Sequence, residues 1–229
     1  GPKSFYTELS GQALVNVHDF LLNWPETIVG NNNDIETIKF VKDRKYILRI
    51  RTSLIPGPQA TFIFKIFLFN KIRHRFRNIW MPLDELFNLL AAKARGVPTP
   101  DIYGLYTLSD KAGLTKQAGI AMQDLAGFET LLHLFQRQDG KGRGELLGAI
   151  SSAIKVLYEN GCHHVDLNPG AVLVNPDDCA DFRIIDFQHA KFFDTPNVES
   201  FLFMISHLAQ GIRPIFEEAG NGDELDSWI

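Results

Sequence analysis

Strand-like and helix-like patterns follow one another along this chain in an order that few folds can accommodate. The first half contains three segments rich in β-branched and aromatic residues, two further strand-like segments, and one segment with helical spacing of its apolar residues. The expected strands are residues 35–41, 46–51, 61–69, 102–108 and 117–123, and the expected helix is residues 82–94. After residue 123 the pattern is mainly helical. We therefore expect an α+β fold in which a small antiparallel sheet precedes a mainly helical region.

The helical region is also expected to contain one short strand pair. Its predicted elements are helices at 128–135, 145–160 and 201–208, a glycine-rich loop at 139–144, and strands at 171–174 and 183–185. The helix at 201–208 is apolar nearly all round, which predicts that it is buried. The two strands are separated by a short polar segment, which predicts a hairpin.

These patterns suggest three parts of the chain. Residues 1–34 are expected to form an N-terminal extension, residues 35–123 a first lobe and residues 124–229 a second lobe. Within the extension, Leu14, Val17 and Leu21 have helical spacing, which predicts a short amphipathic helix between Ser10 and Trp24.

Composition and charge exclude several classes of protein. Hydrophobic residues make up 45% of the 229 residues and charged residues 22%, which is enough to build a core. The net charge of −4 argues against a nucleic-acid-binding protein, so no nucleic-acid partner is expected. Cys162 and Cys179 cannot form a disulfide framework, which favours a reducing compartment. We see no apolar run long enough to span a membrane and no signal peptide.

The segment from Cys162 to Phe187 carries the clearest chemical pattern. A helix ends at Gly161, a loop presents His164, Asp166 and Asn168, and the predicted hairpin leads into Asp186. Because the hairpin brings its two flanks together, Asp166 and Asp186 are expected to face one site. One carboxylate can accept the proton of a substrate hydroxyl while the other holds magnesium, as in phosphoryl transfer. Alternatively, Asp166 starts a turn and Asp186 ends a strand, since Asp-Leu-Asn-Pro-Gly is favourable turn chemistry.

A second pair of charged residues lies upstream. Lys65 sits in the middle of an apolar strand pattern, where a lysine is costly unless it has a partner. Glu85 lies in the next predicted helix, twenty residues later. In kinases a strand lysine contacts the nucleotide phosphates and is held by a helix glutamate. If read alone, Lys65 would be expected to point to solvent, but the downstream aspartates favour the ion pair.

Four features together carry a family resemblance. They are Lys65, Glu85 placed eleven residues before the stretch GVPTP (96–100), the loop HVDLNPG (164–170), and IDF (185–187). From about Ile35 onward the chain resembles the protein-kinase-like fold, and more narrowly the bacterial lipopolysaccharide core sugar kinases of the Kdo and heptose kinase family. The resemblance implies a two-lobed fold with a small antiparallel-sheet N-lobe and a short, mainly helical C-lobe that carries the catalytic hairpin.

The resemblance also implies roles and cofactors. It makes Lys65 and Glu85 the ion pair that orients ATP, Asp166 the catalytic base and Asp186 the ligand of Mg²⁺. Residues 122–125 resemble the hinge between lobes, where the backbone at Gln123 and Leu125 would bind adenine.

The chain departs from the kinase pattern at several positions. Five residues after Asp166, where most kinases carry a metal-binding asparagine, stands Ala171, and alanine cannot bind a metal. Asn168 lies nearby and is a further candidate metal ligand. The turn at 42–45 has no glycine, although its three cations could attract phosphates. Only 43 residues follow Asp186, which fits a kinase for a small substrate or glycolipid better than a protein kinase.

A basic segment precedes the predicted helix at 82–94. In residues 70–80 (NKIRHRFRNIW), Arg73, Arg75 and Arg77 alternate with apolar and aromatic residues. This pattern suits an anionic lipid surface or a phosphorylated sugar. A solvated basic loop is an equal alternative. His163 and His164 fit no standard metal spacing and are expected to be framework residues of their loop.

The expected reaction moves the γ-phosphoryl group of ATP to a sugar hydroxyl, of the lipopolysaccharide core or of another glycolipid. The resemblance implies a cytoplasmic protein, peripheral to the inner face of the bacterial inner membrane. Two alternatives stay open. One is a pseudokinase that binds nucleotide or a partner without catalysis, for which Ala171 is the reason. The other is a kinase for protein or another small molecule.

Overall fold

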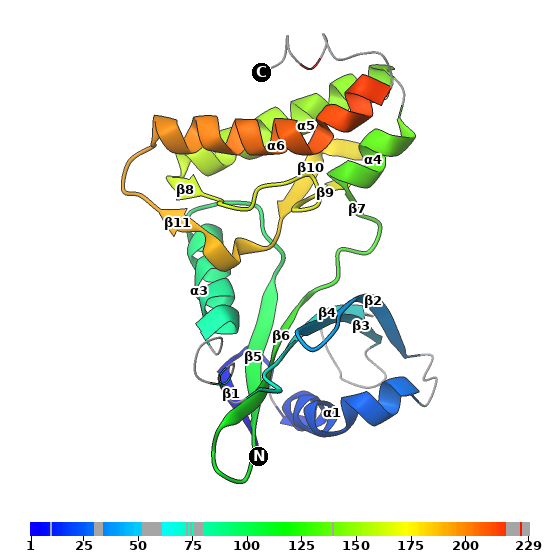
Figure 1. Cartoon of the computed structure of the whole chain (residues 1–229), viewed down its shortest axis with the longest axis vertical. Coiled ribbons are helices and arrows are strands. Elements are labelled where there is room, and N and C mark those ends of the chain that lie inside the picture. Colours follow the sequence, from blue (N-terminus) through cyan, green and yellow to red (C-terminus); the bar gives the residue numbers. More distant parts are fainter. Residues whose placement is uncertain are drawn as a thin grey trace. The chain divides into compact units, whose positions relative to one another are not determined.

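The computed structural model describes residues 1–9, 11–29, 34–51, 61–71, 73, 75, 80–138, 140–218 and 225. The chain divides into two compact units, Gly1–Leu86 with Pro100–Asp124 and Phe87–Thr99 with Leu125–Ile229. Each unit is described by itself (Figure 1). The division into an extension and two lobes at residues 34 and 123 stays a prediction.

The first unit is built on a six-stranded antiparallel sheet with the order β1-β5-β6-β4-β3-β2. The strands are β1 (Pro2–Thr7), β2 (Ile35–Val41), β3 (Lys45–Arg51), β4 (Thr61–Leu68), β5 (Ile102–Ser109) and β6 (Thr115–Gln123). The five strands predicted from the sequence are confirmed. Strand β1 was not predicted, and it places the start of the chain at one edge of the sheet, paired with β5. Residues 52–60, between β3 and β4, lie outside the described residues.

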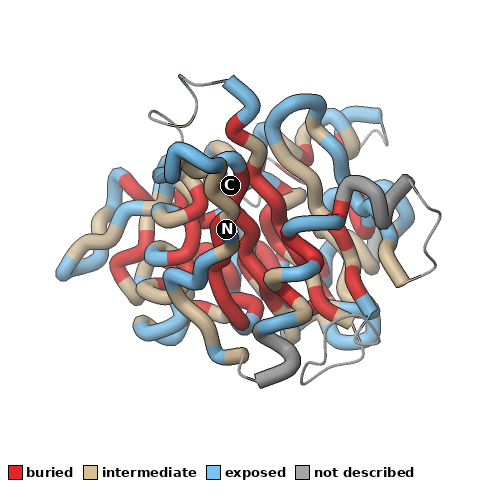
Figure 2. Tube along the Cα trace, turned by 90° about the horizontal axis from the view of Figure 1, so that it is seen from below, coloured by how far each residue is buried: buried red, intermediate tan, exposed pale blue. Residues whose placement is uncertain are grey.

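Helix α1 (Gly11–Val29) covers one face of this sheet. Its side chains Val17, Phe20, Leu21 and Trp24 pack against inward-facing residues of β3, β4 and β5. Figure 2 shows the buried parts of the chain in red. The amphipathic helix expected between Ser10 and Trp24 is therefore present, but it extends to Val29.

Helix α3 (Trp80–Ala94) confirms the predicted helix at 82–94, although the buried face differs from the expected one. The apolar spacing predicts a stripe that includes Phe87, but Phe87 is 61% exposed. Instead, Glu85, Leu86, Leu89 and Ala92 are buried. The buried face of α3 contains the carboxylate of Glu85, so a prediction from apolar residues alone puts this face in the wrong place.

The second unit combines three helices with two small sheets. Its helices are α4 (Leu131–Arg137), α5 (Gly140–Glu159) and α6 (Val198–Glu218). Its strands are β7 (Glu129–Thr130), β8 (Cys162–His163), β9 (Val172–Asn175), β10 (Asp178–Ile184) and β11 (Lys191–Phe192), with a short 3₁₀ turn η1 (Phe187–His189). The predicted hairpin is confirmed as the antiparallel pair β9–β10, which β7 extends to three strands.

Three predictions for the second unit are wrong in detail: the glycine-rich loop, the start of the helix expected from Phe128, and the last helix. The glycine-rich segment expected as a loop forms the first turns of α5, since packing of later residues such as Ile150 outweighs the low helix propensity of glycine. The helix expected from Phe128 begins at Leu131, where Thr130 caps it by accepting a hydrogen bond from the His133 N–H.

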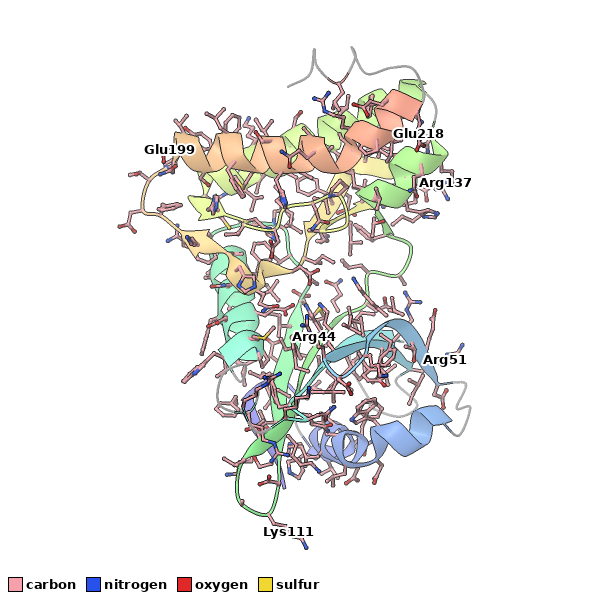
Figure 3. All side chains as sticks on the ribbon, viewed as in Figure 1. Arg44, Arg51, Lys111, Arg137, Glu199 and Glu218 are labelled. Carbon is pink, nitrogen blue, oxygen red and sulfur yellow. The ribbon has the colours of Figure 1, made fainter. Side chains whose placement is uncertain are left out.

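The last helix, α6, was expected to be short and buried. It runs for 21 residues, between Glu199 near its start and Glu218 at its end (Figure 3), and it is amphipathic. Leu202 and Phe203 lie on its exposed side, whereas Met204 and Leu208 are buried. The predicted segment, 201–208, is mostly apolar and was too short to include the polar positions of the longer helix.

Among the described residues, no helix is both long enough and apolar enough to cross a bilayer.

Candidate functional site

The first functional element is a buried ion pair between strand β4 and helix α3. Phe64 and Ile66 of β4 point into the core beneath α1, so Lys65 between them points to the opposite face. There its Nζ lies 2.6 Å from Oε1 of Glu85, and the two side chains are 4% and 2% exposed. The structure brings together the two residues that the sequence singled out, and it rules out a solvent-facing Lys65.

This ion pair is costly to maintain. Taking two charges out of water costs several kcal/mol per ion, and their mutual attraction recovers that cost only when the geometry is good. Oε2 of Glu85 is also buried, and no described residue forms a hydrogen bond with it. A pair of this kind is weak evidence for stability, so a functional reason for its presence is favoured.

The second element is the loop that follows helix α5. Gly161 ends the helix with a φ of +61°, and a Cβ there would lie 2.3 Å from the Phe193 carbonyl oxygen. Asp166 then lies exposed in the loop, and no described residue forms an ion pair with its carboxylate. Such a carboxylate is accessible to a substrate hydroxyl, as a general base requires.

Asn168 organises this loop. Its Nδ2 donates to the backbone oxygen of Asp166 at 2.9 Å, and its Oδ1 accepts from the Gly170 N–H at 2.8 Å. Both ends of the amide are therefore used within the loop. The role of Asn168 as a metal ligand stays a prediction, because both polar atoms of its side chain already form hydrogen bonds in the loop.

His164 connects this loop to the segment of Asp186. Its Nε2 donates to the Ile185 carbonyl oxygen at 2.8 Å, and its ring packs edge-on against Phe187 with 4.8 Å between centroids. Burial lowers the pKa of His164, so the ring stays neutral and its Nδ1 carries no proton. The sequence predicted a framework histidine, and His164 has that role. Its bond to Ile185 brings the two aspartate segments side by side.

Asp186 has an unusual backbone conformation. Its φ of 64° and ψ of 46° lie in the left-handed region, which is costly for most residues but is tolerated by aspartate and asparagine. Ile185 before it donates its N–H to the Ala171 carbonyl oxygen at 2.9 Å. Such conformations persist only where surrounding contacts hold them, and they cluster at functional sites. The carboxylate of Asp186 is exposed.

Asn88 is a residue that the sequence did not indicate. It lies on α3 one turn after Glu85, and its Nδ2 donates to the Phe187 carbonyl oxygen at 2.9 Å. Helix α3 thus carries the glutamate of the ion pair and also anchors the backbone next to Asp186. A signal was present in the spacing, because residues three apart share a helix face.

We expect Asn88→Asp to lower the free energy of unfolding by about 1–3 kcal/mol, because a carboxylate oxygen would replace the donor that faces the Phe187 carbonyl. If Asp186 holds the magnesium of a bound nucleotide, as the family resemblance implies, the substitution should also weaken magnesium-dependent ATP binding, since the Asp186 segment loses its anchor. Chemical denaturation and calorimetry measure the two effects. Asp84→Asn, the reverse atom exchange at an exposed site on the same helix, is the control and should change neither quantity. Equal effects of both variants would refute this role of Asn88.

The predicted hinge contains a second ion pair, in which Asp124 is buried and the Arg49 side chain is 35% exposed. Asp124 accepts hydrogen bonds from Arg49 Nε at 2.8 Å and from Thr61 Oγ1 at 2.6 Å. The Gln123 N–H donates to the Asp101 carbonyl oxygen at 2.7 Å, so this donor is already used. No described residue accepts the N–H of Leu125. The Leu125 N–H is therefore a backbone donor of this segment that a ligand could use.

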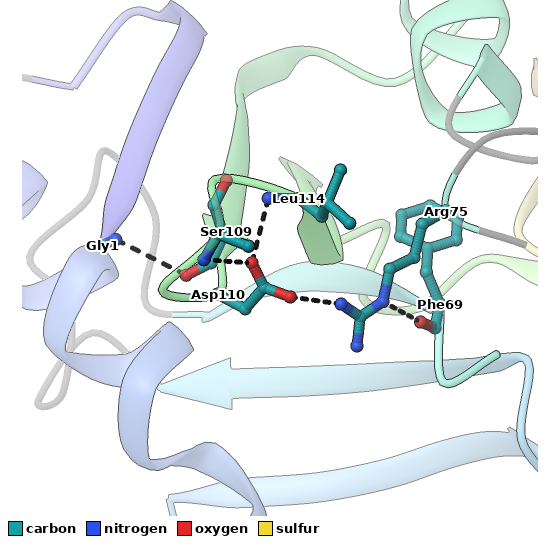
Figure 4. A network of polar contacts seen from close by, with 7 residues as sticks. Gly1, Phe69, Arg75, Ser109, Asp110 and Leu114 are labelled. Atoms are coloured by element: carbon teal, nitrogen blue, oxygen red, sulfur yellow. Dashed lines mark hydrogen bonds and ion pairs between the residues drawn. The ribbon is translucent and has the colours of Figure 1, made fainter. Parts of the chain in front are cut away.

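The three arginines of the basic segment differ in their surroundings. Arg75 forms an ion pair with Asp110 and donates from Nε to the Phe69 carbonyl oxygen at 3.1 Å (Figure 4). Burial opposes ionisation of Asp110, but the Leu114 N–H and Arg75 outweigh it, so the pKa of Asp110 lies below its ordinary value. Arg73 is exposed, and Arg77 lies outside the described residues. The structure therefore gives Arg75 a bracing role within the first unit.

Within the described part of the chain, no group of three or more histidine, cysteine, aspartate or glutamate side chains could hold a metal ion. Magnesium differs from zinc in this respect, because it needs only one or two protein carboxylates together with substrate phosphates and water. Asp186 fits that requirement by its chemistry.

A comparison with solved structures identifies the fold. The chain resembles a structure described as WaaP in complex with acyl carrier protein, with a TM-score of 0.50 and 17% identity, covering 89% of this chain and 88% of that one. At this identity the likeness concerns the fold alone. The protein has the two-lobed, protein-kinase-like α+β fold that the sequence predicted.

The family follows from the sequence comparison. The model of the lipopolysaccharide kinase (Kdo/WaaP) family matches residues 69–197, which is more than half of the chain. The chain therefore belongs to the lipopolysaccharide kinase (Kdo/WaaP) family. The matched region includes Glu85, Asp166 and Asp186, and it begins four residues after Lys65.

One curated protein matches a shorter part of the chain. The chain is 31% identical over 85 residues to the calcium/calmodulin-dependent protein kinase cmkB of Emericella nidulans. The match covers 37% of this chain and only 21% of that kinase, so the chain spans about one fifth of the relative's length.

Proposed function

We propose that this protein transfers the γ-phosphoryl group of ATP to a sugar hydroxyl of the lipopolysaccharide core. The observation that carries the proposal is the buried pair of Lys65 and Glu85, with 2.6 Å between Nζ and Oε1. A lysine fixed in this way on a sheet strand can bind nucleotide phosphates, as in kinases. Membership of the lipopolysaccharide kinase family supports the acceptor class.

Each site residue receives one role in this proposal. Lys65 binds phosphate oxygens of the nucleotide, and Glu85 keeps its ammonium group in position. The Leu125 N–H binds the adenine, and Gln123, whose N–H is already used by Asp101, contributes its carbonyl oxygen. Asp186 holds magnesium, which neutralises charge on the phosphates when it is bound. Asp166 orients the acceptor hydroxyl.

The reaction is an in-line displacement at phosphorus. The acceptor oxygen forms a bond to the γ-phosphorus, and the bond from the γ-phosphorus to the bridging oxygen of ADP breaks. The hydroxyl proton passes to the carboxylate of Asp166, which later releases it to water. His164 and Asn168 maintain the shape of the loop around Asp166, and their hydrogen bonds are complete within it.

The acceptor and ATP would meet at the inner face of the bacterial inner membrane, where lipopolysaccharide core sugars are available to a kinase that uses ATP. We place the protein there as a part of the proposal.

A pseudokinase is the second candidate, and Ala171 favours it. Ala171 is 1% exposed, and its backbone is bonded to Asn168 and Ile185. The position therefore offers no side-chain ligand, and the amide of Asn168 is used within the loop. A protein with Asp186 as its chief metal ligand could bind nucleotide and transfer phosphate slowly or not at all.

A thermal-shift titration with ATP, with and without magnesium, tests the nucleotide part of the proposal. The parent should be stabilised by ATP, and more so with magnesium, because a ligand that binds only the folded state raises its stability. Asp186→Asn should remove the magnesium-dependent part. Asparagine tolerates the left-handed backbone, so the variant tests the charge and not strain.

Asp177→Asn, an exposed aspartate in the turn between β9 and β10, is the matched control and should behave like the parent. No stabilisation of the parent by ATP with magnesium would contradict the proposal. Stabilisation without phosphoryl transfer would favour the pseudokinase. In that case Ala171→Asn, which restores the usual ligand type, should raise transfer if the missing ligand is the cause.

A further inference from the structure

One end of the sheet in the first unit carries an unusual excess of positive charge. The turn between β2 and β3, the end of β4 and the start of β6 meet there: the Leu68 N–H donates to the Arg44 carbonyl oxygen at 2.7 Å, and the Phe69 N–H to that of Lys116 at 2.8 Å. We call this region the basic end and define it by five exposed cations, Lys42, Arg44, Lys71, Arg73 and Lys116.

These five cations lack ion-pair partners among the described residues. Two acidic residues lie among these cations. Asp110 is bound by Arg75, whereas Asp43, which also lines the hollow described below, accepts a hydrogen bond from Asn70 at 3.4 Å and forms no ion pair with a described residue. A chain with a net charge of −4 has thus gathered unpaired positive charge in one place. Lys111 lies beyond it, at the tip of the turn between β5 and β6 (Figure 3).

A hollow with an aromatic wall lies within the basic end. It has a volume of about 620 Å³, and Lys42, Arg75 and Lys116 contribute its cationic lining. The aromatic wall runs from buried Trp24 through Tyr46, with 4.8 Å between centroids, to Phe40, with 4.5 Å. Phe40 is 51% exposed, so an apolar ring reaches the surface beside the cations.

We propose that the basic end docks this protein on a bilayer that contains anionic phospholipid, with a lipid phosphate in the hollow and Phe40 in contact with the interface. Cations attract the headgroups, and aromatic rings are favoured at the boundary between headgroups and acyl chains. A bilayer is favoured over an acidic protein because the acceptor in the proposed function is itself part of a lipid, and to that extent the inference rests on it.

The structure also changes which residues matter for such docking. The sequence treated Arg73, Arg75 and Arg77 alike, as candidate contacts to anionic lipid or a phosphorylated sugar. Arg75 instead braces the segment against Asp110, while Lys42, Arg44 and Lys116 join the surface from other parts of the chain. A membrane test that uses Arg75 would therefore confuse unfolding with loss of binding.

Sedimentation with vesicles tests the proposal. Parent protein should sediment with vesicles of phosphatidylcholine and phosphatidylglycerol in equal parts, much less with phosphatidylcholine alone, and less as salt is added. Lys71→Glu/Arg73→Glu/Lys116→Glu should partition at least about 100-fold more weakly, given the contribution of each basic residue near an anionic surface. The matched control, Lys3→Glu/Lys155→Glu/Lys191→Glu, makes the same change of charge at exposed sites elsewhere and should partition within about threefold of the parent.

If the glutamate variant fails to fold, the same three residues changed to glutamine keep the test available, and this variant should also lose most of its partitioning. Parent protein that sediments no better with anionic vesicles than with phosphatidylcholine would overturn the proposal. An equal loss in the control variant would overturn it too, because net charge alone would then explain binding.

Transfer of phosphate to deacylated lipopolysaccharide core separates this inference from the proposed function. The basic-end variant should keep that transfer, since the acceptor needs no bilayer. Transfer without vesicle binding by the parent would leave the proposed function intact and refute the docking surface. Vesicle binding without transfer would leave the docking surface intact and contradict the proposed function. Loss of transfer in the variant would show that the surface belongs to the catalytic site, which also contradicts the inference.

Discussion

Asp166→Asn is expected to lower the rate of phosphoryl transfer by a factor of about 10² to 10⁴, the usual contribution of a general base. Magnesium-dependent ATP binding should stay close to that of the parent, because Asp166 acts on the acceptor hydroxyl and not on the nucleotide. Asparagine has the same size, and the loop bond from Asn168 goes to the backbone oxygen of Asp166, which the substitution retains. The fold of the loop should therefore be unchanged.

Radiolabelled ATP and calorimetry measure the two properties of this variant. Asp194→Asn, at an exposed aspartate of the same unit, serves as the control and should match the parent in both. If Asp166→Asn transferred phosphate at the rate of the parent, the carboxylate would not be the base. If it lost ATP binding as well, its effect would lie in the nucleotide site.

Lys65→Ala is expected to destabilise the protein by about 3–5 kcal/mol, because it leaves the buried carboxylate of Glu85 without its partner. From the sequence alone, this substitution would be expected to weaken ATP binding and leave the fold intact. The 3% exposure of Lys65 changes that expectation. Chemical denaturation of Lys65→Ala and of the parent measures the difference.

A double variant separates stability from function. Lys65→Met/Glu85→Leu removes both charges and keeps similar volumes, so it should recover most of the lost stability, as replaced buried ion pairs often do. It should still bind ATP much more weakly than the parent, since the phosphates lose their cation. A double variant with parental ATP affinity would show that the pair is structural only.

Local pattern was sufficient to predict strands β2 to β6 and the β9–β10 hairpin. The antiparallel succession of β2, β3 and β4, which are rich in β-branched and aromatic residues, could be predicted, but the position of β6 between β5 and β4 could not. The pair of Lys65 and Glu85 could also be predicted, since a lysine within an apolar strand requires a partner.

Long-range contacts explain what could not be predicted. Strand β1 gains its partner, β5, about a hundred residues later, and its sequence alone carries no strong strand signal. Asp124, which follows β6, binds Arg49 of β3, and Arg75 binds Asp110, so both aspartates looked like ordinary polar residues in sequence. Asn88 gave a signal only through its spacing from Glu85. In each case the partner is fixed by the fold and not by neighbours in the chain.

Transfer of labelled γ-phosphate from ATP to deacylated lipopolysaccharide core, taken from a strain that lacks the corresponding kinase, tests the central claim most directly. The account predicts magnesium-dependent labelling of the core sugar by the parent, and a loss of about 10²-fold or more with Asp166→Asn. Absence of labelling by the parent and by Ala171→Asn, in protein that still binds ATP with magnesium, would contradict the proposed reaction.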